Sequence, residues 1–167
     1  MLFRSTIQDE HIIFYLDDKQ AVTSPVRFYH NLNSRVTLLK LIPSMDSGVL
    51  DYFATRNDAV IIESFGVGGL PTYEGNDFHQ AIERWIDAGK IVVMTTQVTN
   101  EGSNMSIYEV GKTIKQEFGL LEAYDMTLEA TVTKLMWILG QTTAPTEIRR
   151  LFHQTINRDM LYTTGLS

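Results

Sequence analysis

The chain has 167 residues and a formal net charge of −6, and it contains no cysteine. The length suits a single domain, and the acidic balance gives no electrostatic footprint for nucleic acid or an anionic membrane. The absence of cysteine excludes disulfides, thiol nucleophiles and thiolate metal sites.

The sequence also shows no apolar amino-terminal region of the kind found in signal peptides, and its apolar stretches are too short to span a bilayer. A cytoplasmic protein is therefore expected.

The first part of the chain, up to about residue 33, is the least regular. Apolar runs at residues 11–16 and 26–29 indicate two strands, with a polar turn at residues 17–19 between them. The pattern does not place either strand in a sheet.

From residue 36 onward, strand patterns alternate with helix patterns. Apolar runs at residues 36–42, 58–62 and 91–94 predict three strands, and Pro43 ends the first. The second run is almost entirely apolar and β-branched, which is typical of a strand covered on both faces.

Helices are expected between and after these strands. Residues 47–56 carry apolar side chains at helical spacing, and residues 78–86 form one apolar stripe that ends before a C-cap glycine, Gly89. A further helix is predicted over residues 107–118, ending at Gly119.

Two helices close the chain. Residues 126–139 predict a helix with Thr127 as N-cap and Gly140 at its end. Pro145 opens the last helix, with one apolar face formed by Ile148, Leu151, Phe152 and Ile156.

Strands that alternate with helices predict a three-layer, Rossmann-like α/β domain with a parallel sheet of about four strands and helices on both faces. Functional loops of such sheets lie at the carboxyl ends of the strands. The loops at residues 63–75 and 95–106 are therefore the candidates for a site.

The glycine-rich part of the first loop does not fit a dinucleotide-binding loop. A G-x-G-x-x-G pattern that starts at Gly66 requires glycine at position 71, where the chain has Pro71. The next helix also begins too late to direct its amino terminus at the loop. A turn that uses glycine for positive φ is the simpler interpretation.

Other kinds of site find little support. The polar loop at residues 95–104 suits a small polar pocket as well as a solvated loop. The four histidines lack metal-ligand spacing, and Trp85 and Trp137 lie on apolar helical stripes that indicate core positions. No catalytic constellation, cofactor or metal is expected from these patterns.

Several motifs, which span residues 36–156, resemble the type I, cytoplasmic, bacterial L-asparaginases. They are S-F-G-V-G at residues 64–68, T-Q at 96–97, N-M at 104–105 with Tyr108 and Gly111, and D-M-T-L-E-A-T-V-T-K-L at 125–135. The last motif is the longest and the most specific.

This resemblance implies the C-terminal domain of a two-domain enzyme that hydrolyses L-asparagine to L-aspartate and ammonia. The family's nucleophilic threonine belongs to a T-G-G-T motif and its aspartate to a G-T-D motif, and this chain contains neither. Because a nucleophile and its base must lie within hydrogen-bond reach, the isolated chain is predicted to be inactive. Residues 1–35 would be an interdomain connection and residues 36–167 the C-terminal domain.

The resemblance also implies a role in a dimer or tetramer, where this domain completes the neighbouring subunit's active site. The residues that match this role are Gly66, Gly68, Gly69, Asn104 and Tyr108. Many family members have asparagine where this chain has Gly69, so a side-chain contact to substrate is expected to be lost there.

An effector pocket for asparagine, known in some type I members, would involve Glu63, Thr96 and Val98. Effector-responsive members carry arginine where this chain has Glu63. Because a carboxylate repels the carboxylate of a ligand, weak or absent activation is expected.

Two alternatives stay open. One is the asparaginase-like subunit of a tRNA-dependent amidotransferase, which the acidic charge disfavours because it would need RNA contacts. The other is a non-catalytic binding or assembly module of the same fold.

Overall fold

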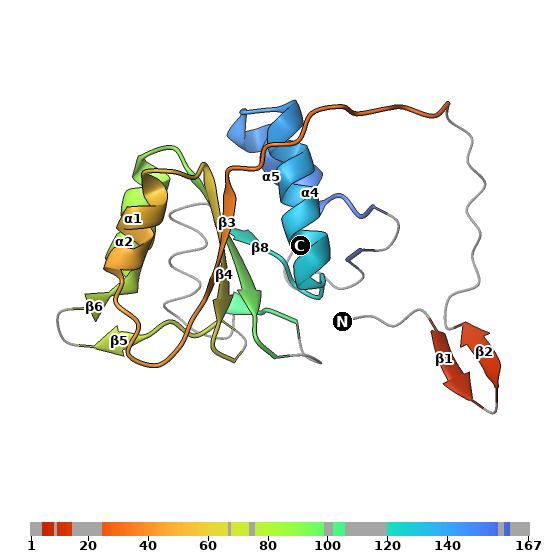
Figure 1. Cartoon of the computed structure of the whole chain (residues 1–167), viewed down its shortest axis with the longest axis horizontal. Coiled ribbons are helices and arrows are strands. Elements are labelled where there is room, and N and C mark those ends of the chain that lie inside the picture. Colours follow the sequence, from red (N-terminus) through yellow and green to blue (C-terminus); the bar gives the residue numbers. More distant parts are fainter. Residues whose placement is uncertain are drawn as a thin grey trace.

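The computed structural model describes residues 5–8, 10–14, 25–66, 68–73, 76–98, 102–105, 120–156 and 159–160. Its centre is a four-stranded parallel sheet with the strand order β3-β4-β7-β8 (Figure 1). These strands span Val36–Lys40, Ala59–Ser64, Ile91–Thr96 and Leu121–Glu122. The predicted α/β class with about four parallel strands is confirmed, and β8 is the strand that the pattern did not locate.

Helices cover both faces of this sheet (Figure 1). Helices α1 (Gly48–Ala54) and α2 (Phe78–Asp87) pack on one face, and α4 (Leu128–Gln141) and α5 (Pro145–His153) pack on the other. The result is the expected three-layer arrangement with two separate hydrophobic cores.

Strand β4 is buried along its whole length because successive side chains enter different cores. Val60 and Ile62 join the core under α1 and α2, whereas Ala59 and Ile61 join the core under α4 and α5. This explains why the run contains almost no polar residue until its carboxyl end.

The two tryptophans differ from each other in burial. Trp85 of α2 is 1% exposed, and its Nε1 donates to the carbonyl of Leu50 at 2.8 Å, which confirms its prediction as a core residue. Trp137 of α4 is only partly buried and packs edge to face against Tyr29, with 5.2 Å between the ring centroids. The core interpretation of Trp137 is thus too strong, because this ring lies at the margin of its core.

Side chains cap the amino termini of α4 and α2, and a glycine follows the carboxyl terminus of α2. Thr127 caps α4 as predicted, with its side chain accepting from the amide of Ala130 at 3.2 Å. Asp77 caps α2 in the same way and was not anticipated. Gly89, with φ of +72°, follows α2 in the conformation expected of a C-terminal glycine.

The prediction that Gly140 ends α4 is wrong, because the helix continues to Gln141. A Cβ at Gly140 would lie 2.4 Å from the carbonyl oxygen of Asn31. Glycine is needed here because an extended stretch of residues 25–35, called the connecting segment below, crosses the helix at this point. The amide of Asn33 donates to the carbonyl of Met136 at 2.9 Å, which fixes the crossing.

The strand predicted at residues 26–29 is also wrong. The connecting segment crosses the carboxyl-terminal part of α4 instead of pairing in a sheet (Figure 1). The apolar run at residues 11–16 does contain a strand, β2 (His11–Phe14), which pairs antiparallel with β1 (Ser5–Gln8).

The last helix is shorter than expected. Ile148 and Phe152 of α5 are buried as predicted, but Ile156 lies beyond the helix and is 42% exposed. The helix predicted at residues 107–118 falls outside the described residues. A short hairpin, β5 (Thr72–Tyr73) and β6 (Asn76–Asp77), interrupts the loop before α2. Within the described part of the chain, no helix has the length and apolar character to cross a bilayer.

Candidate functional site

The two candidate loops begin at the same edge of the sheet. Because β4 and β7 are parallel neighbours with Ser64 opposite Thr96, their carboxyl ends bring both loops together. The Ser64 hydroxyl is buried and donates to the carbonyl of Thr95 at 2.7 Å. This bond joins the two strand ends where the loops start.

The glycine-rich loop is a tight turn. The amide of Phe65 donates to the carbonyl of Gly69 at 3.0 Å, and the amides of Gly68 and Gly69 both donate to the Phe65 carbonyl. Gly66 and Gly68 have φ of +50° and +148°, which confirms the prediction of glycines at positive φ. Because the amides of Gly68 and Gly69 are used inside the turn, they have little capacity left for a ligand.

The turn also packs on the second loop. A Cβ at Gly68 would lie 3.2 Å from Cγ of Met105, so glycine permits the close approach. The structure thereby brings three predicted site residues, Gly66, Gly68 and Gly69, next to the loop that carries Asn104.

The second loop is anchored to β8 and to the turn that follows it. Ser103 donates its amide to the carbonyl of Tyr124 at 2.8 Å, and Met105 donates its amide to Oε1 of the fully buried Glu122 at 2.7 Å. A Cβ at Gly102 would meet the Tyr124 carbonyl at 2.8 Å. Asn104, which lies between these anchors, is half-buried. Tyr108, the fifth predicted residue of this group, lies outside the described residues.

The predicted effector residues begin with Glu63, which is buried at the end of β4 and paired with Lys40. The distance from Lys40 Nζ to Glu63 Oε2 is 3.7 Å. Gln97 holds the backbone of this corner, because its Nε2 donates to the carbonyls of Leu41 at 2.7 Å and of Glu63 at 3.0 Å. Sequence reasoning assigned no role to Lys40 or Gln97, although the register of parallel strands would have placed Lys40 beside Glu63.

Thr96 and Val98 belong to the other side of this corner. The Thr96 hydroxyl donates to the carbonyl of Gly66 and accepts from the amide of Val98 at 2.9 Å. Glu63 pairs with Thr95 across the strands, so side-chain alternation places Glu63 and Thr96 on opposite faces of the sheet. The structure brings Thr96 and Val98 together and directs the Glu63 side chain elsewhere.

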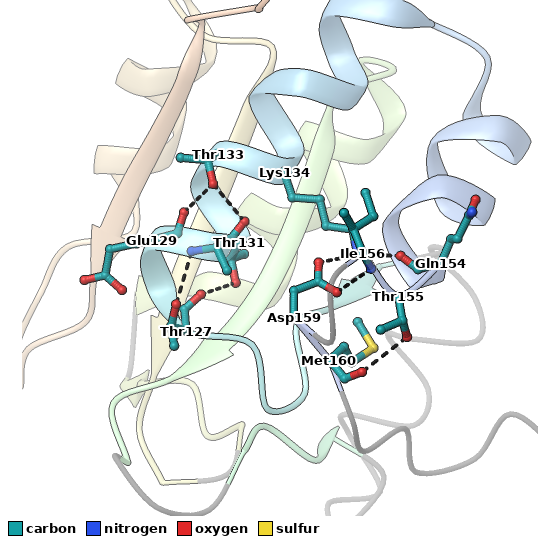
Figure 2. Close-up of polar contacts among 11 residues, drawn as sticks. Thr127, Glu129, Thr131, Thr133, Lys134, Gln154, Thr155, Ile156, Asp159 and Met160 are labelled. Atoms are coloured by element: carbon teal, nitrogen blue, oxygen red, sulfur yellow. Dashed lines mark hydrogen bonds and ion pairs between the residues drawn. The ribbon is translucent and has the colours of Figure 1, made fainter. Parts of the chain in front are cut away.

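The longest motif, D-M-T-L-E-A-T-V-T-K-L at residues 125–135, has structural tasks in this chain (Figure 2). Thr127 caps α4, and the Thr131 hydroxyl donates back to the Thr127 carbonyl at 2.9 Å. Lys134 is almost fully buried and reaches across to the residues that follow α5, where Nζ lies 2.8 Å from the Asp159 carboxylate and 2.8 Å from the Gln154 carbonyl.

Metal chemistry gains no support from the geometry. Among the residues whose positions are described, no group of three or more histidine, aspartate or glutamate side chains is arranged to hold a metal ion. The side-chain polar groups described in this corner are hydroxyls and an amide, and those of Ser64, Thr96 and Gln97 donate to backbone carbonyls of the corner itself.

These features define an α/β domain in which two loops pack against each other at the carboxyl edge of a parallel sheet. Residues 35–152 match the glutaminase/asparaginase C-terminal domain family, and the chain belongs to that family. The resemblance noted from the motifs is confirmed.

Individual relatives agree with the family match. The chain is 38% identical to an L-asparaginase of Thermococcus kodakarensis over 129 residues, which are 77% of this chain and 38% of that protein. It is 31% identical to a glutamyl-tRNA(Gln) amidotransferase subunit of Pyrococcus abyssi over 121 residues, 72% of this chain and 26% of that protein. The chain therefore spans well under half of either relative.

Solved structures give the same result. The thermostable L-asparaginase from Thermococcus kodakarensis superposes with a TM-score of 0.82 at 31% identity, covering 96% of this chain and 48% of that one. The L-asparaginase I from Vibrio cholerae superposes with a TM-score of 0.67 at 26% identity, covering 77% of this chain and 38% of that one.

Proposed function

We propose that this chain acts as the C-terminal half of an L-asparaginase, an amidohydrolase that converts L-asparagine to L-aspartate and ammonia. The family match over residues 35–152 supports the class, and the identity to the Thermococcus kodakarensis L-asparaginase supports the substrate. The observation that carries the proposal is the packing of the Gly66–Gly69 turn against the loop at residues 102–105. This packing joins the two loops into one edge, which in this proposal closes a pocket formed by other protein groups.

In this proposal the chain contributes no nucleophile. Gly66, Gly68, Gly69, Asn104 and Tyr108 complete the active site of a neighbouring subunit in a homodimer or tetramer. The turn supplies shape and the half-buried Asn104 supplies the polar side chain. Residues 1–35 would connect this domain to the half that carries the chemistry, and residues 36–167 would form the domain itself.

Activation by asparagine at Glu63, Thr96 and Val98 is expected to be weak or absent. The Glu63 carboxylate is already paired with Lys40, and its side chain lies on the sheet face opposite Thr96. Calorimetric titration of the chain with L-asparagine should show no saturable heat. Saturable binding that Glu63→Gln abolishes would contradict this expectation.

A second candidate is the asparaginase-like subunit of a tRNA-dependent amidotransferase. The 31% identity to the Pyrococcus abyssi amidotransferase subunit favours it, whereas the net charge of −6 is unfavourable for RNA contacts. A third candidate is a non-catalytic module of the same fold. We place the protein in the cytoplasm in each case, because the lack of cysteine suits a reducing compartment.

The test is an assay of ammonia release from L-asparagine. The chain is assayed alone and after mixing with the separately produced amino-terminal half of the Thermococcus kodakarensis L-asparaginase. We expect no activity alone and activity in the mixture. In the proposal the amino-terminal half supplies the nucleophile and its base, and the loops of this chain complete the site around them. Activity of the chain alone would refute the proposal that the nucleophile and its base belong to the amino-terminal half.

The control for the mixture is the C-terminal half of the same relative, which shows whether two separated halves can reassemble. If that control is active and the mixture with this chain is silent, the non-catalytic module becomes the better description.

A further inference from the structure

Strand β8 carries a fully buried carboxylate, that of Glu122. The neighbouring Leu121 joins the core under α4 and α5, so alternation along the strand places the Glu122 side chain on the opposite sheet face. Met94, which pairs with Glu122 across the strands, belongs to the core on that face, under α1 and α2. A carboxylate in such surroundings loses its hydration, and hydrogen bonds must offset the loss.

The Glu122 carboxylate holds the backbone of the second candidate loop. Its Oε1 accepts from the amide of Met105 at 2.7 Å. Hydrogen bonds to a carboxylate are shorter and stronger than those between neutral groups. This bond therefore fixes the chain on the carboxyl-terminal side of Asn104, the predicted site residue next to Met105.

A second bond holds the other side of Asn104. Ser103 donates its amide to the carbonyl of Tyr124 at 2.8 Å. Tyr124 has φ of +51°, a backbone conformation that residues with a side chain rarely adopt. Both anchors of Asn104 thus come from β8 and the strained turn that follows it.

The position of Met105 also determines how the two candidate loops meet. A Cβ at Gly68 would lie 3.4 Å from the Cα of Met105 and 3.2 Å from its Cγ. The glycine turn therefore packs on both the backbone and the side chain of Met105. A shift of this residue would displace the turn and Asn104 together.

We propose that Glu122 is a positioning residue, which holds Met105, and through it Asn104 and the glycine turn, in the arrangement that completes a neighbouring subunit's active site. This inference rests on the proposed function. An apolar side chain would fill the same space without the cost of burying a carboxylate, so core packing alone gives no reason for glutamate here. Because Glu122 is fully buried, it acts through the loop and not on the substrate.

Hydrogen exchange of backbone amides, measured by NMR on the full chain, tests the hold on the loop. The test variant is Glu122→Met, which keeps the length of the side chain but has only a weak thioether acceptor. The matched control is Glu122→Gln, whose amide oxygen can accept the same bond. The rate at Met105 is divided by the rate at Ile61 of the central strand β4, so that a change in global stability cancels. We expect this ratio to rise at least about tenfold in Glu122→Met and to stay within about threefold in Glu122→Gln.

Ammonia release from L-asparagine, in the mixture with the amino-terminal half of the Thermococcus kodakarensis L-asparaginase, tests the consequence for catalysis. We expect Glu122→Met to lower kcat/KM at least about tenfold, because a small misplacement of a site residue is costly, and Glu122→Gln to retain most of the activity. Asn104→Ala should lower kcat/KM in the original chain and change it little in Glu122→Met, because the two substitutions remove the same contact.

The exchange measurement can overturn the inference by itself. An unchanged ratio in Glu122→Met would show that the bond does not hold the loop. Equal rises in Glu122→Met and Glu122→Gln would show that the bond to Met105 is not what matters. Should Glu122→Met not fold, Glu122→Asp takes its place with the same expected result, because its side chain is one methylene shorter and the bond is lost.

The activity measurement separates this inference from the proposed function. If the original chain is active in the mixture and Glu122→Met is equally active, the proposed function survives and the inference fails. Fully additive losses from Glu122→Met and Asn104→Ala would also overturn it, because Glu122 would then act elsewhere. If the original chain is silent while the two halves of the relative are active together, the proposed function fails, and the role of Glu122 in catalysis fails with it.

Discussion

At Gly140 of helix α4, the backbone of the connecting segment occupies the position that a Cβ would take. In an open helix, Gly→Ala stabilises by up to about 1 kcal/mol. Here the new Cβ would lie 2.4 Å from a backbone oxygen of Asn31, which cannot move without the segment. Overpacking costs about 1–3 kcal/mol, so the clash should outweigh the gain in helix propensity.

We therefore expect Gly140→Ala to lower the free energy of unfolding and to loosen the contact between Tyr29 and Trp137. Urea unfolding measures the first effect, and tryptophan fluorescence measures the second. A variant that is more stable than the original chain would show that the segment does not press on the helix.

Single residues were also where prediction from the sequence was weakest. A glycine after an apolar helical stripe has the same pattern whether it ends the helix or admits a crossing segment, so Gly140 was misassigned. Gln97 and Glu122 serve the site through bonds to backbone groups of distant segments. Because such bonds depend on tertiary proximity, no spacing rule in the sequence reveals them.

Asp58 ties the connecting segment to the start of β4. Its carboxylate accepts from the Asn33 amide group at 3.0 Å and from Nε of Arg35 at 3.1 Å. The hydrogen bond from Asn33 is the largest of the effects that hold the pKa of Asp58 below its ordinary value; burial opposes it, and the charge and hydrogen bond of Arg35 lower the pKa further. The side chain is 42% exposed, so solvent screening reduces the energy involved.

Asp58→Ala should lower the free energy of unfolding by about 1 kcal/mol at neutral pH. A carboxyl group with a lowered folded-state pKa stabilises fully above its unfolded-state pKa, and this contribution is lost as pH falls through the folded-state value. The unfolding free energies of the variant and the original chain should thus converge under strongly acidic conditions. Urea titrations across that pH range measure the difference, and a constant gap would contradict the assignment.

Among the elements, long periodic segments were predicted well and short or unpaired ones were not. The apolar stripe of α2 has the helical period, and the short β-branched run of β4 is typical of a buried strand. Strand β8 has only two residues, which is too short for an alternation of apolar and polar residues to indicate a strand. The run at residues 26–29 resembles a strand, yet Val26 and Phe28 are 74% and 79% exposed and only Tyr29 packs on α4.

The ion pair between Lys134 and Asp159 links α4 to the end of the described chain. Its side chains are 4% and 15% exposed, in contrast to the surface pair Arg150 and Glu147 at 58% and 41%. Removing one member of a buried pair leaves an uncompensated charge, whereas an exposed pair contributes little.

Lys134→Met is expected to cost about 3 kcal/mol of unfolding free energy, because Asp159 would lose its counter-ion. Lys134→Met combined with Asp159→Asn should recover part of that loss, and Arg150→Met should change stability little. Urea unfolding of the three variants is the measurement. Equal losses in Lys134→Met and Arg150→Met would show that burial does not strengthen the pair.

For the molecule as a whole, the sequence predicted the layers, the family and the edge of the sheet where the candidate loops lie. The packing of the glycine turn on Met105 was not predictable, because it depends on how closely two loops approach. The role of Glu63 depends on a strand neighbour, Lys40, that is 23 positions away in the sequence.

Lys40 has a second consequence for the protein in solution. Strand β3 is an outer strand of the described sheet, and an outer strand with exposed apolar residues can recruit another copy by edge-to-edge pairing. Leu38 is 39% exposed on this strand, and Ile42 just beyond it is 55% exposed, with the charged Lys40 between them. Lysine at such a position acts as a gatekeeper against aggregation. The same ammonium group that accompanies Glu63 at the candidate site thus also places a charge between the exposed apolar side chains of this outer strand.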